Sequence, residues 1–424
     1  MGKNCRISEL INGIHQIEAD NNNIDKDGFI VELIKEFVSE NGVVDDKRLT
    51  AFLSTLEKDH NLISAKVVNG LIDDNVINET DLNKIGIRQA FIDALSTNEG
   101  KNYPDPDGLL SKIEHLSTEV YFWGIPASGK TCAIGAMLTM AAKSDLPQLK
   151  VFNNSGNCQG KKYMNELTMM FPYNRDYVYN KDYVSDVMSL PDGTPVKNTY
   201  EMFFELIDNR NKVLPITFID MAGELIRIMY KKVNPDKNKP ITDEEEQALQ
   251  TVTNVLKDNR TENQKLHVFV VEYGGENRKY EGVSQTNYLL AAITYLEKIK
   301  CDDGSTFNVF KDKTDGIYLM VTQVDKARKQ DDELKVHVKN YMNGGNNYNS
   351  IANKLKYICE KNHINGGKLA VMLFSLGEVC FKKYCLFSPR FTEKALQALL
   401  SHVYRYDKRL KTPWINWIYK ILGS

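Results

Sequence analysis

Eight consecutive residues carry the most specific chemical signal in this chain of 424 residues. They run Gly124-Ile125-Pro126-Ala127-Ser128-Gly129-Lys130-Thr131, which fits the pattern G-x-x-x-x-G-K-[ST]. The two glycines let the backbone curl so that its N–H groups converge on phosphate oxygens, and Lys130 adds a cation at the β- and γ-phosphates. The hydroxyl of Thr131 can serve as a ligand for Mg²⁺. We call these residues the phosphate loop and predict that they bind a nucleotide.

The segments that flank the phosphate loop fit this prediction. Residues 119–123 are rich in β-branched and aromatic side chains and predict a buried strand. Residues 131–143 predict a helix that is packed on most of its sides. A strand, a glycine-containing loop and a helix N-terminus together hold an anionic phosphate at the positive end of the helix dipole. An ordinary glycine turn before a helix is the alternative interpretation.

A second motif begins at Asp220, which ends an apolar run. A carboxylate is thereby placed at the end of a buried strand, where a ligand of Mg²⁺ must lie to face Thr131. The sequence continues to Gly223 and gives the spacing D-x-x-G. A glycine at this position lets a backbone N–H approach a γ-phosphate, because no side chain is in the way. We therefore expect Asp220 and Gly223 at the phosphate site.

A third motif, T-Q-x-D, follows another apolar run and comprises Thr322, Gln323 and Asp325. The Asp325 carboxylate can accept two hydrogen bonds from the N1 and N2 donors of guanine. Adenine has no such donor pair and would leave the charge unpaired. Ser375 and Leu376 end the next run, and their main chain can line the pocket of the base.

The order and placement of these motifs resemble the Ras-like GTPases, the translation-factor-related class of P-loop proteins, over roughly residues 115–406. The resemblance implies one nucleotide domain that binds GTP or GDP together with Mg²⁺. It implies that the phosphate loop holds the phosphates and that Asp220 holds Mg²⁺ through water. It also implies that Gly223 contacts the γ-phosphate and that Asp325 recognises guanine, with Ser375-Leu376 on the far side of the base.

The same resemblance suggests roles in hydrolysis, which Lys130 would assist by stabilising charge. Glu224 occupies the position at which the family often has a glutamine that orients the attacking water. Gln323 occupies the position of a lysine in the family and is expected to lie along the base. The switch threonine, which binds Mg²⁺ and acts in catalysis, is expected at Thr194, with Thr199 as second choice and two turn residues as the alternative. Arg227 is either a charge-stabilising residue or a solvent-exposed helix arginine.

Apolar runs that alternate with helical segments predict the architecture around these motifs. Besides 119–123, we expect strands at 201–206, 213–219, 266–271, 317–321 and 369–374. Helices are expected at 284–298, 333–342, 351–360 and 392–404. This alternation predicts an α/β fold in which a mainly parallel sheet is flanked by helices. In such sheets ligands bind beyond the carboxyl ends of the strands, where the motifs lie.

Residues 1–108 are expected to form a small all-α domain, followed by a GTPase-like domain at 109–424. Helical periodicity appears at 29–38, 49–56 and 87–95, and the breaker cluster 103–108 marks the boundary. Asn23 to Gly28 resembles the start of an EF-hand loop, but the twelfth position is Ile34, which cannot close the cage. A helix-initiating turn is the expected structure there.

Three further segments have no motif of their own. Two polar insertions, at about 144–198 and 228–264, exceed ordinary connection lengths and are candidate switch or partner surfaces, with solvated decoration as the alternative. They look more like the prokaryotic double-GTPase branch of the family. Near the chain end, aromatic and aliphatic residues between 414 and 422 repeat at helical spacing among basic residues. This segment is an interfacial anchor, a partner helix or a helix packed on the domain.

Composition narrows the class of function. A net charge of −2 gives no field that would favour nucleic acid, and no apolar run approaches the roughly 20 residues of a membrane span. The seven cysteines show no C-x-x-C spacing and no secretion signal is evident, so we expect a cytoplasmic protein. We expect a GTP-binding switch that hydrolyses GTP slowly and engages a protein partner. The alternatives are an ATP-binding P-loop enzyme and a non-hydrolysing nucleotide-binding scaffold.

Overall fold

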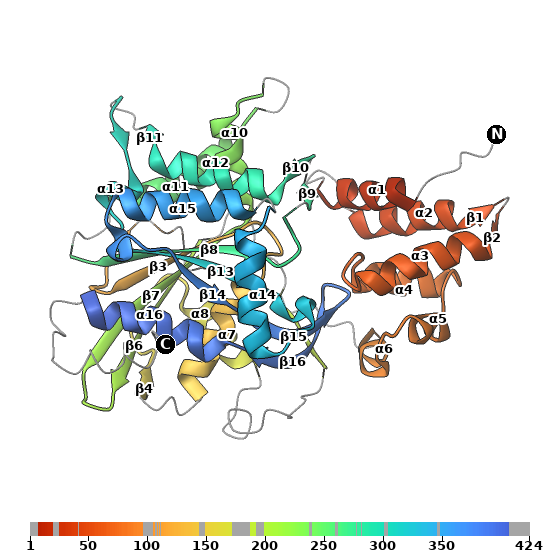
Figure 1. Ribbon diagram of the computed structural model, residues 1–424, viewed down its shortest axis with the longest axis horizontal. Helices are drawn as coiled ribbons and strands as arrows, with labels where there is room; N and C mark the ends of the chain where they lie inside the picture. The colour runs from red at the N-terminus through yellow and green to blue at the C-terminus, as the bar shows by residue number, and fades with distance from the viewer. Residues whose placement is uncertain are drawn as a thin grey trace.

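The computed structural model describes most of the chain (Figure 1). The described residues are 7–19, 25–40, 42–95, 105–106, 108, 110, 112–143, 149–171, 187–191, 199–236, 240–258, 262–276, 278–280, 282–300, 304–345 and 348–406. The first six helices lie at one end of the molecule, and the sheet with its covering helices lies at the other (Figure 1).

A seven-stranded sheet forms the centre of the larger part. Its strands are β3 (Thr118–Trp123), β4 (Leu149–Asn153), β6 (Thr199–Asp208), β7 (Val213–Met221), β8 (Gln264–Glu272), β13 (Gly316–Thr322) and β14 (Ala370–Leu373). Their order across the sheet is β14-β13-β8-β3-β7-β6-β4. The pairs from β14 to β7 are parallel, whereas β6 is antiparallel to both β7 and β4. The predicted α/β fold with a mainly parallel sheet is confirmed.

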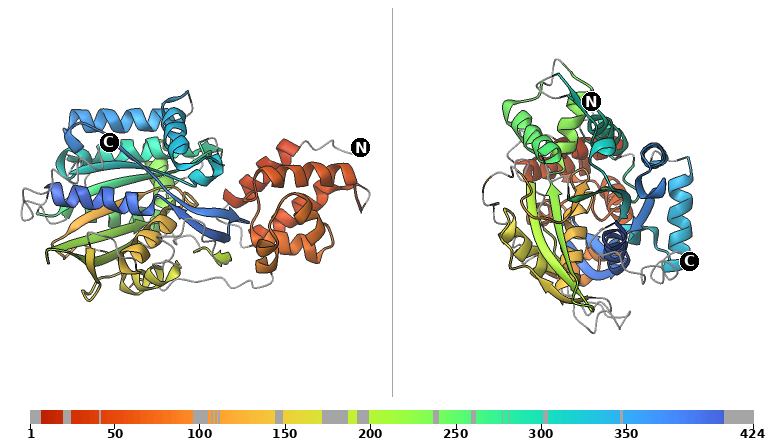
Figure 2. Two further views of the ribbon diagram at one scale, coloured as in Figure 1. Left: turned by 60° about the horizontal axis from the view of Figure 1, so that its bottom comes forward. Right: turned by 90° about the vertical axis from the view of Figure 1, so that its left-hand side faces the viewer.

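Helices cover both faces of this sheet, as the two views in Figure 2 show. One face packs against α7 (Lys130–Lys143), α8 (Lys161–Met170) and α16 (Thr392–Tyr406). The other packs against α10 (Glu224–Val233), α11 (Asp243–Asp258), α12 (Gln285–Glu297), α13 (Val309–Asp312), α14 (Asp331–Asn343) and α15 (Tyr348–Lys361). In β3, Val120 and Phe122 join the first core while Tyr121 and Trp123 join the second, so every residue of the strand is buried. This two-sided burial explains why the strand is a continuous apolar run.

Smaller elements lie in the connections between the strands and helices of this sheet. A three-stranded sheet contains β5 (Val187–Ser189), β15 (Ser375–Cys380) and β16 (Tyr384–Arg390), in the order β15-β16-β5. Two short antiparallel pairs are β9 (Lys279–Tyr280) with β10 (Val283–Ser284) and β11 (Ile299–Lys300) with β12 (Thr306–Phe307). The 3₁₀ turns η1 (Val324–Ala327) and η2 (Ile364–Gly366) complete this part.

We call residues 7–95 the N-terminal unit, and its described residues (7–19, 25–40 and 42–95) form six helices and one short strand pair. The helices are α1 (Ile7–Ala19), α2 (Lys26–Val38), α3 (Asp46–Lys58), α4 (Ala65–Asp73), α5 (Glu79–Lys84) and α6 (Gln89–Leu95). The strand pair is β1 (Ser39–Glu40) with β2 (Val43–Val44), so the described part of this unit is mainly but not wholly helical. The division of the chain at residue 108 stays a prediction.

The EF-hand-like residues begin a helix, as expected. The side chain of Asp25 accepts a hydrogen bond of 3.0 Å from the Gly28 N–H and thereby caps α2. Among the described residues, no group of three or more His, Cys, Asp or Glu side chains is arranged to hold a metal ion.

Both predicted insertions contain elements that belong to the core. In the first, Met164 and Leu167 of α8 are fully buried, and in the second Val252 and Leu256 of α11 are buried. Solvated decoration therefore does not describe these parts of the insertions. The aromatic segment at 414–422 lies outside the described residues. Within the described part of the chain, no helix combines the length and apolar character needed to cross a bilayer.

Candidate functional site

The phosphate loop connects β3 to α7 and borders a cavity of about 310 Å³ at the carboxyl edge of the sheet. Gly129 has a φ of +79°, a conformation that residues with a Cβ rarely adopt, and α7 begins at the next residue, Lys130. The first N–H groups of a helix have no partners within the helix. The loop therefore brings unpaired N–H groups and a positive helix end to the cavity.

A buried ion pair links the phosphate loop to the D-x-x-G motif. The Lys130 ammonium lies 2.7 Å from Oδ1 of Asp220, and the two side chains are 6% and 0% exposed. The Thr131 hydroxyl donates to Oδ2 of Asp220 at 3.0 Å. The register of β7 on β3 produces this contact, because Asp220 lies opposite Phe122, two residues before the loop begins. Strand pairing thus brings together residues 90 positions apart in the chain.

A tyrosine that the sequence analysis did not single out as a site residue completes this cluster. Tyr163, on α8 in the first insertion, donates its hydroxyl to Oδ2 of Asp220 at 2.9 Å. Its ring stacks on Tyr200 of β6 with a centroid distance of 3.8 Å. Asp220 therefore accepts hydrogen bonds from an ammonium and two hydroxyls, which compensate for the burial of its charge. No local pattern around Tyr163 could have revealed this contact, because it depends on how α8 packs on the sheet.

Gly223 lies directly against the phosphate loop. A Cβ at this position would stand 2.3 Å from the backbone N of Pro126 and 2.7 Å from the carbonyl carbon of Ile125. Its φ is −63°, so the close approach of the two backbones, not the conformation, requires glycine here. Glu224 follows as the first residue of α10 and borders the cavity.

The T-Q-x-D motif is tied to the phosphate loop by two side chains. The Thr322 hydroxyl donates to the Ser128 carbonyl at 2.6 Å, and Nε2 of Gln323 donates to the Ala127 carbonyl at 3.3 Å. Gln323 has a φ of +55°, which turns the chain from β13 into η1. The motif that is expected to contact a base is therefore fixed relative to the loop that is expected to contact phosphates.

Asp325 borders the cavity and meets Ser375. The Ser375 hydroxyl donates to Oδ1 of Asp325 and accepts a hydrogen bond of 3.0 Å from the Gly377 N–H. Burial raises the pKa of Asp325 above its ordinary value, and the hydrogen bond from Ser375 opposes this shift. The backbone bond from Phe374 N–H to the Val321 carbonyl, at 2.9 Å, joins the two strand ends that carry these residues.

Most residues proposed from the sequence border the same cavity. These are Ile125, Pro126, Ala127, Ser128, Gly129, Lys130, Thr131, Gly223, Glu224, Thr322, Gln323, Asp325 and Leu376. Asp220 and Ser375 do not border the cavity themselves. Asp220 contacts the cavity residue Lys130, and Ser375 contacts the cavity residue Asp325. Gly124 is not part of the wall and lies behind it, where a Cβ would stand 2.5 Å from Oγ of Ser128.

Thr194, the first choice for the switch threonine, lies outside the described residues. Two other proposed residues do not border the cavity. Thr199 begins β6 and is buried. Arg227 is neither a cavity residue nor solvent-exposed, because α10 buries it in the helical layer, where it hydrogen-bonds Tyr288. The interpretation of Arg227 as a solvent-exposed helix arginine is therefore wrong.

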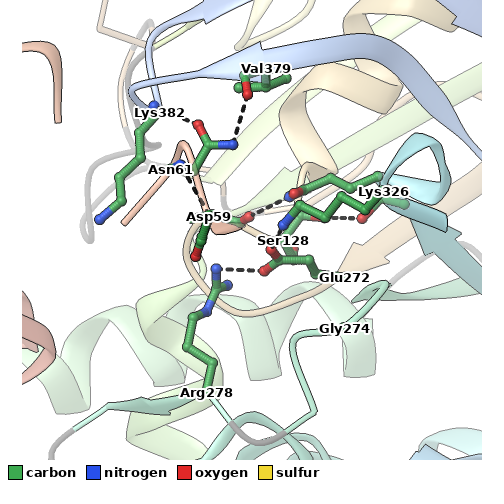
Figure 3. Close-up of polar contacts among 12 residues, drawn as sticks. Asp59, Asn61, Ser128, Glu272, Gly274, Arg278, Lys326, Val379 and Lys382 are labelled. Atoms are coloured by element: carbon green, nitrogen blue, oxygen red, sulfur yellow. Dashed lines mark hydrogen bonds and ion pairs between the residues drawn. The ribbon is translucent and has the colours of Figure 1, made fainter. Parts of the chain in front are cut away.

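A charged cluster that no motif predicted forms another part of the wall (Figure 3). Glu272, at the end of β8, lies 2.5 Å from Nη1 of Arg278 and 2.6 Å from Nζ of Lys326. Nη2 of Arg278 and the hydroxyl of Tyr280 both donate to the Pro126 carbonyl, at 3.4 and 3.2 Å. The cluster thus supports the third residue of the phosphate loop from outside.

Comparison with known proteins gives no family assignment. No family model and no curated protein matches the chain. One solved structure with local likeness is the RocCORdC part of Methanosarcina barkeri Roco2 bound to GDP, at 11% identity and a TM-score of 0.28. That match covers 73% of this chain and 53% of the other, so the chain spans about half of that structure. A second is a candidate nucleolar GTP-binding protein 1 from Plasmodium falciparum, at 11% identity and a TM-score of 0.30, covering 74% of this chain and 98% of the other.

TM-scores this low carry no argument about fold or function. The functional interpretation therefore depends on the cavity itself. Its wall combines a helix N-terminus, the Lys130 ammonium and the half-buried Asp325 carboxylate, and hydroxyl oxygens gather at Asp220 next to it.

Proposed function

We propose that this chain binds guanine nucleotide together with Mg²⁺ and hydrolyses GTP slowly. One observation carries the proposal: Lys130 and Thr131 of the phosphate loop and Asp325, from a distant segment, border one cavity. A cavity lined by both a phosphate loop and a carboxylate suits a ligand with an anionic chain and a hydrogen-bond-donating base.

The residues around Asp220 fit a magnesium ion. Mg²⁺ prefers oxygen ligands, and Oγ1 of Thr131 lies 3.0 Å from Oδ2 of Asp220, so a hydroxyl and a carboxylate already converge. Thr131 would bind the ion directly, Asp220 would hold it through water, and Thr194 is proposed as a further ligand. When bound, Mg²⁺ would neutralise charge on the β- and γ-phosphate oxygens.

Phosphoryl transfer to water requires positioning and charge stabilisation, which the phosphate loop can supply. Lys130 and the N–H groups of residues 125–131, Pro126 excepted, would bind the phosphate oxygens. Gly223 would bring its backbone N–H to the γ-phosphate, because the loop and this residue are already in backbone contact. Glu224 would orient the attacking water, and its negative charge near the γ-phosphate is the reason that we expect slow hydrolysis.

Selectivity for guanine would come from Asp325. Its carboxylate would accept from N1 and N2 of the base, while Gln323 lies along the ring and Leu376 contacts its far side. An adenine would offer the Asp325 carboxylate no pair of N–H donors, and the lost hydrogen bonds would cost several kcal/mol. The hydrogen bond from Ser375 fixes the carboxylate in place before the base arrives.

We further propose that the protein is a cytoplasmic switch that signals to a protein partner through its insertions or N-terminal unit, as in the prokaryotic double-GTPase branch. The described cysteines fit a reducing compartment, since Cys132, Cys158, Cys359, Cys380 and Cys385 are free thiols. The contact of Tyr163 with Asp220 supports a link between the first insertion and the site, because it joins the two directly.

Titration with fluorescent mant-GTP and mant-ATP in the presence of Mg²⁺ tests the proposal. We expect GTP to bind at least tenfold more tightly than ATP, and equal or tighter binding of ATP would overturn the guanine assignment. A single-turnover phosphate-release assay then tests hydrolysis. Release over minutes to hours supports a slow GTPase, whereas no release over many hours would leave a nucleotide-binding scaffold.

A further inference from the structure

The N-terminal unit reaches the wall of the cavity. Asn61, in the loop between α3 and α4, borders the cavity although it precedes the phosphate loop by more than 60 residues. Asp59 accepts a hydrogen bond of 3.0 Å from the Asn61 N–H and so fixes the loop locally (Figure 3). Asn61 is therefore held in place before it makes contacts outside its own unit.

The Asn61 side chain clamps the turn between β15 and β16. Its Nδ2 donates to the Val379 carbonyl at 2.8 Å, and its Oδ1 accepts from the Lys382 N–H at 2.8 Å (Figure 3). Two backbone bonds of 3.0 Å flank this clamp, from Phe381 N–H to the His60 carbonyl and from Ala65 N–H to the Phe381 carbonyl. The side-chain amide thus satisfies one donor and one acceptor of the turn at once.

The clamped turn has an unfavourable backbone conformation. Phe381 and Lys382 have φ values of +55° and +57°, and neither is glycine. Consecutive residues with positive φ are usually Gly, Asn or Asp, because a larger side chain clashes with its own backbone. Phe381 is fully buried in the core of the N-terminal unit. Contacts with that unit therefore compensate for a conformation that the turn sequence does not favour.

The same turn is continuous with the part of the cavity wall that lies next to Asp325. Strand β15 begins at Ser375, which hydrogen-bonds Asp325, and Leu376, Gly377, Val379 and Lys382 all border the cavity. A displacement of the turn would move this wall, because only a few extended residues separate Val379 from Ser375. A second link is the ion pair between Lys382 and Glu18 of α1.

We propose that Asn61 is a positioning residue for the nucleotide site. Through Asn61, the N-terminal unit fixes the position of the turn, and the turn fixes the part of the cavity wall next to Asp325. Nucleotide binding and docking of the N-terminal unit on the turn therefore favour each other. Such coupling is reciprocal, so bound nucleotide would also tighten the contact between the unit and the turn. This inference rests on the proposed binding of guanine nucleotide.

Release of mant-GDP from the full-length chain tests this inference. In Asn61→Ala, loss of two hydrogen bonds should speed release about tenfold. The matched control is Asn69→Ala, because Asn69 donates to the Leu95 carbonyl at 3.1 Å inside the N-terminal unit and does not border the cavity. We expect the control to lower the melting temperature without changing the release rate. Asn61→Asp keeps the acceptor for Lys382 N–H but loses the donor to Val379, so its rate should be intermediate.

Hydrogen exchange of the Phe381 and Lys382 amides gives a second measurement. In the wild type, GDP should slow their exchange, and Asn61→Ala should abolish this protection. If the wild type binds mant-GDP and Asn61→Ala releases it at the wild-type rate, the positioning role is wrong while the proposed function stands. If Asn61→Ala and Asn69→Ala speed the release of mant-GDP equally, the effect of Asn61 is one of stability alone, and the inference is also overturned. If the wild type binds no guanine nucleotide, the proposed function fails and the inference fails with it.

Discussion

The ammonium of Lys130 lies 2.7 Å from the carboxylate of Asp220, and both groups are buried. Each is the partner that makes burial of the other tolerable, because an unpaired charge in a protein interior is strongly destabilising. In the proposed function, Lys130 would bind phosphate and Asp220 would hold Mg²⁺.

Replacing Lys130 by Met should weaken mant-GTP binding by about two orders of magnitude or more, since a charged contact is lost. It should also lower the free energy of unfolding by about 3 kcal/mol, because Asp220 loses its cation. Lys265→Met is the control, since Lys265 is a buried lysine of β8 close to Glu119 that does not border the cavity. The control should lose stability and keep nucleotide affinity, and a comparable loss of affinity in both would contradict the prediction.

Tyr163→Phe removes a hydroxyl from Asp220 and keeps the ring that stacks on Tyr200. A hydrogen bond to a charged group contributes about 1.5–3 kcal/mol, so the Mg²⁺ concentration for half-maximal GTP binding should change about tenfold. Tyr121→Phe removes a hydroxyl that donates to the buried Glu119 at 2.6 Å, away from the cavity. It should change only thermal stability. An unchanged Mg²⁺ dependence in Tyr163→Phe would remove this tyrosine from the proposed site.

Gly223→Ala should disrupt the contact between the D-x-x-G motif and the phosphate loop. The added methyl would meet backbone atoms at 2.3 and 2.7 Å, which cannot move aside as a flexible side chain can. We expect at least a tenfold loss of GTP affinity, from a strain of a few kcal/mol. Gly345→Ala is the control, because a Cβ there meets nothing within 4 Å and its φ is not positive. Circular dichroism should show that both variants remain folded.

The affinity for GDP should depend on the ionisation of Asp325. Burial raises the pKa of Asp325 above the ordinary aspartate value of 3.8. On acidification, this carboxyl therefore becomes protonated at a higher pH than an ordinary aspartate does. The protonated group cannot accept from both N1 and N2 of guanine, and mant-GDP affinity should therefore fall as the pH drops through the raised pKa. In Asp325→Asn this dependence should disappear, guanine should bind at least tenfold more weakly, and xanthine nucleotide should bind better. A pH profile that is the same in both proteins would contradict the assignment.

Protein stability should depend on the ionisation of Glu201. Burial raises the pKa of this β6 carboxyl from 4.5 to about 7, and its Oε1 has no hydrogen-bond partner among the described residues. Between these pH values the folded protein keeps a proton that the unfolded chain releases, so the free energy of unfolding falls as the pH rises. The change can reach roughly 3 kcal/mol. Urea unfolding at pH 5 and pH 8 should show this loss in the wild type and a smaller one in Glu201→Gln.

The amino-acid sequence alone indicated the α/β fold, the main strands and helices, and the residues that line most of the cavity. These inferences succeeded because the phosphate loop, Asp220 with Gly223, and Thr322 with Asp325 each lie at a strand end. In a parallel sheet such ends share one edge, so local patterns were sufficient to predict their proximity.

Only the tertiary structure decided which other residues belong to the site. Packing of α8 brings Tyr163 to Asp220, and a turn after β8 brings Arg278 to the phosphate loop. Docking of the N-terminal unit brings Asn61 to the turn between β15 and β16. Arg227 was misplaced for the same reason, because its burial depends on the helices beside α10. Sequence periodicity reports which face of an element is covered, but it carries no information on which distant element covers it.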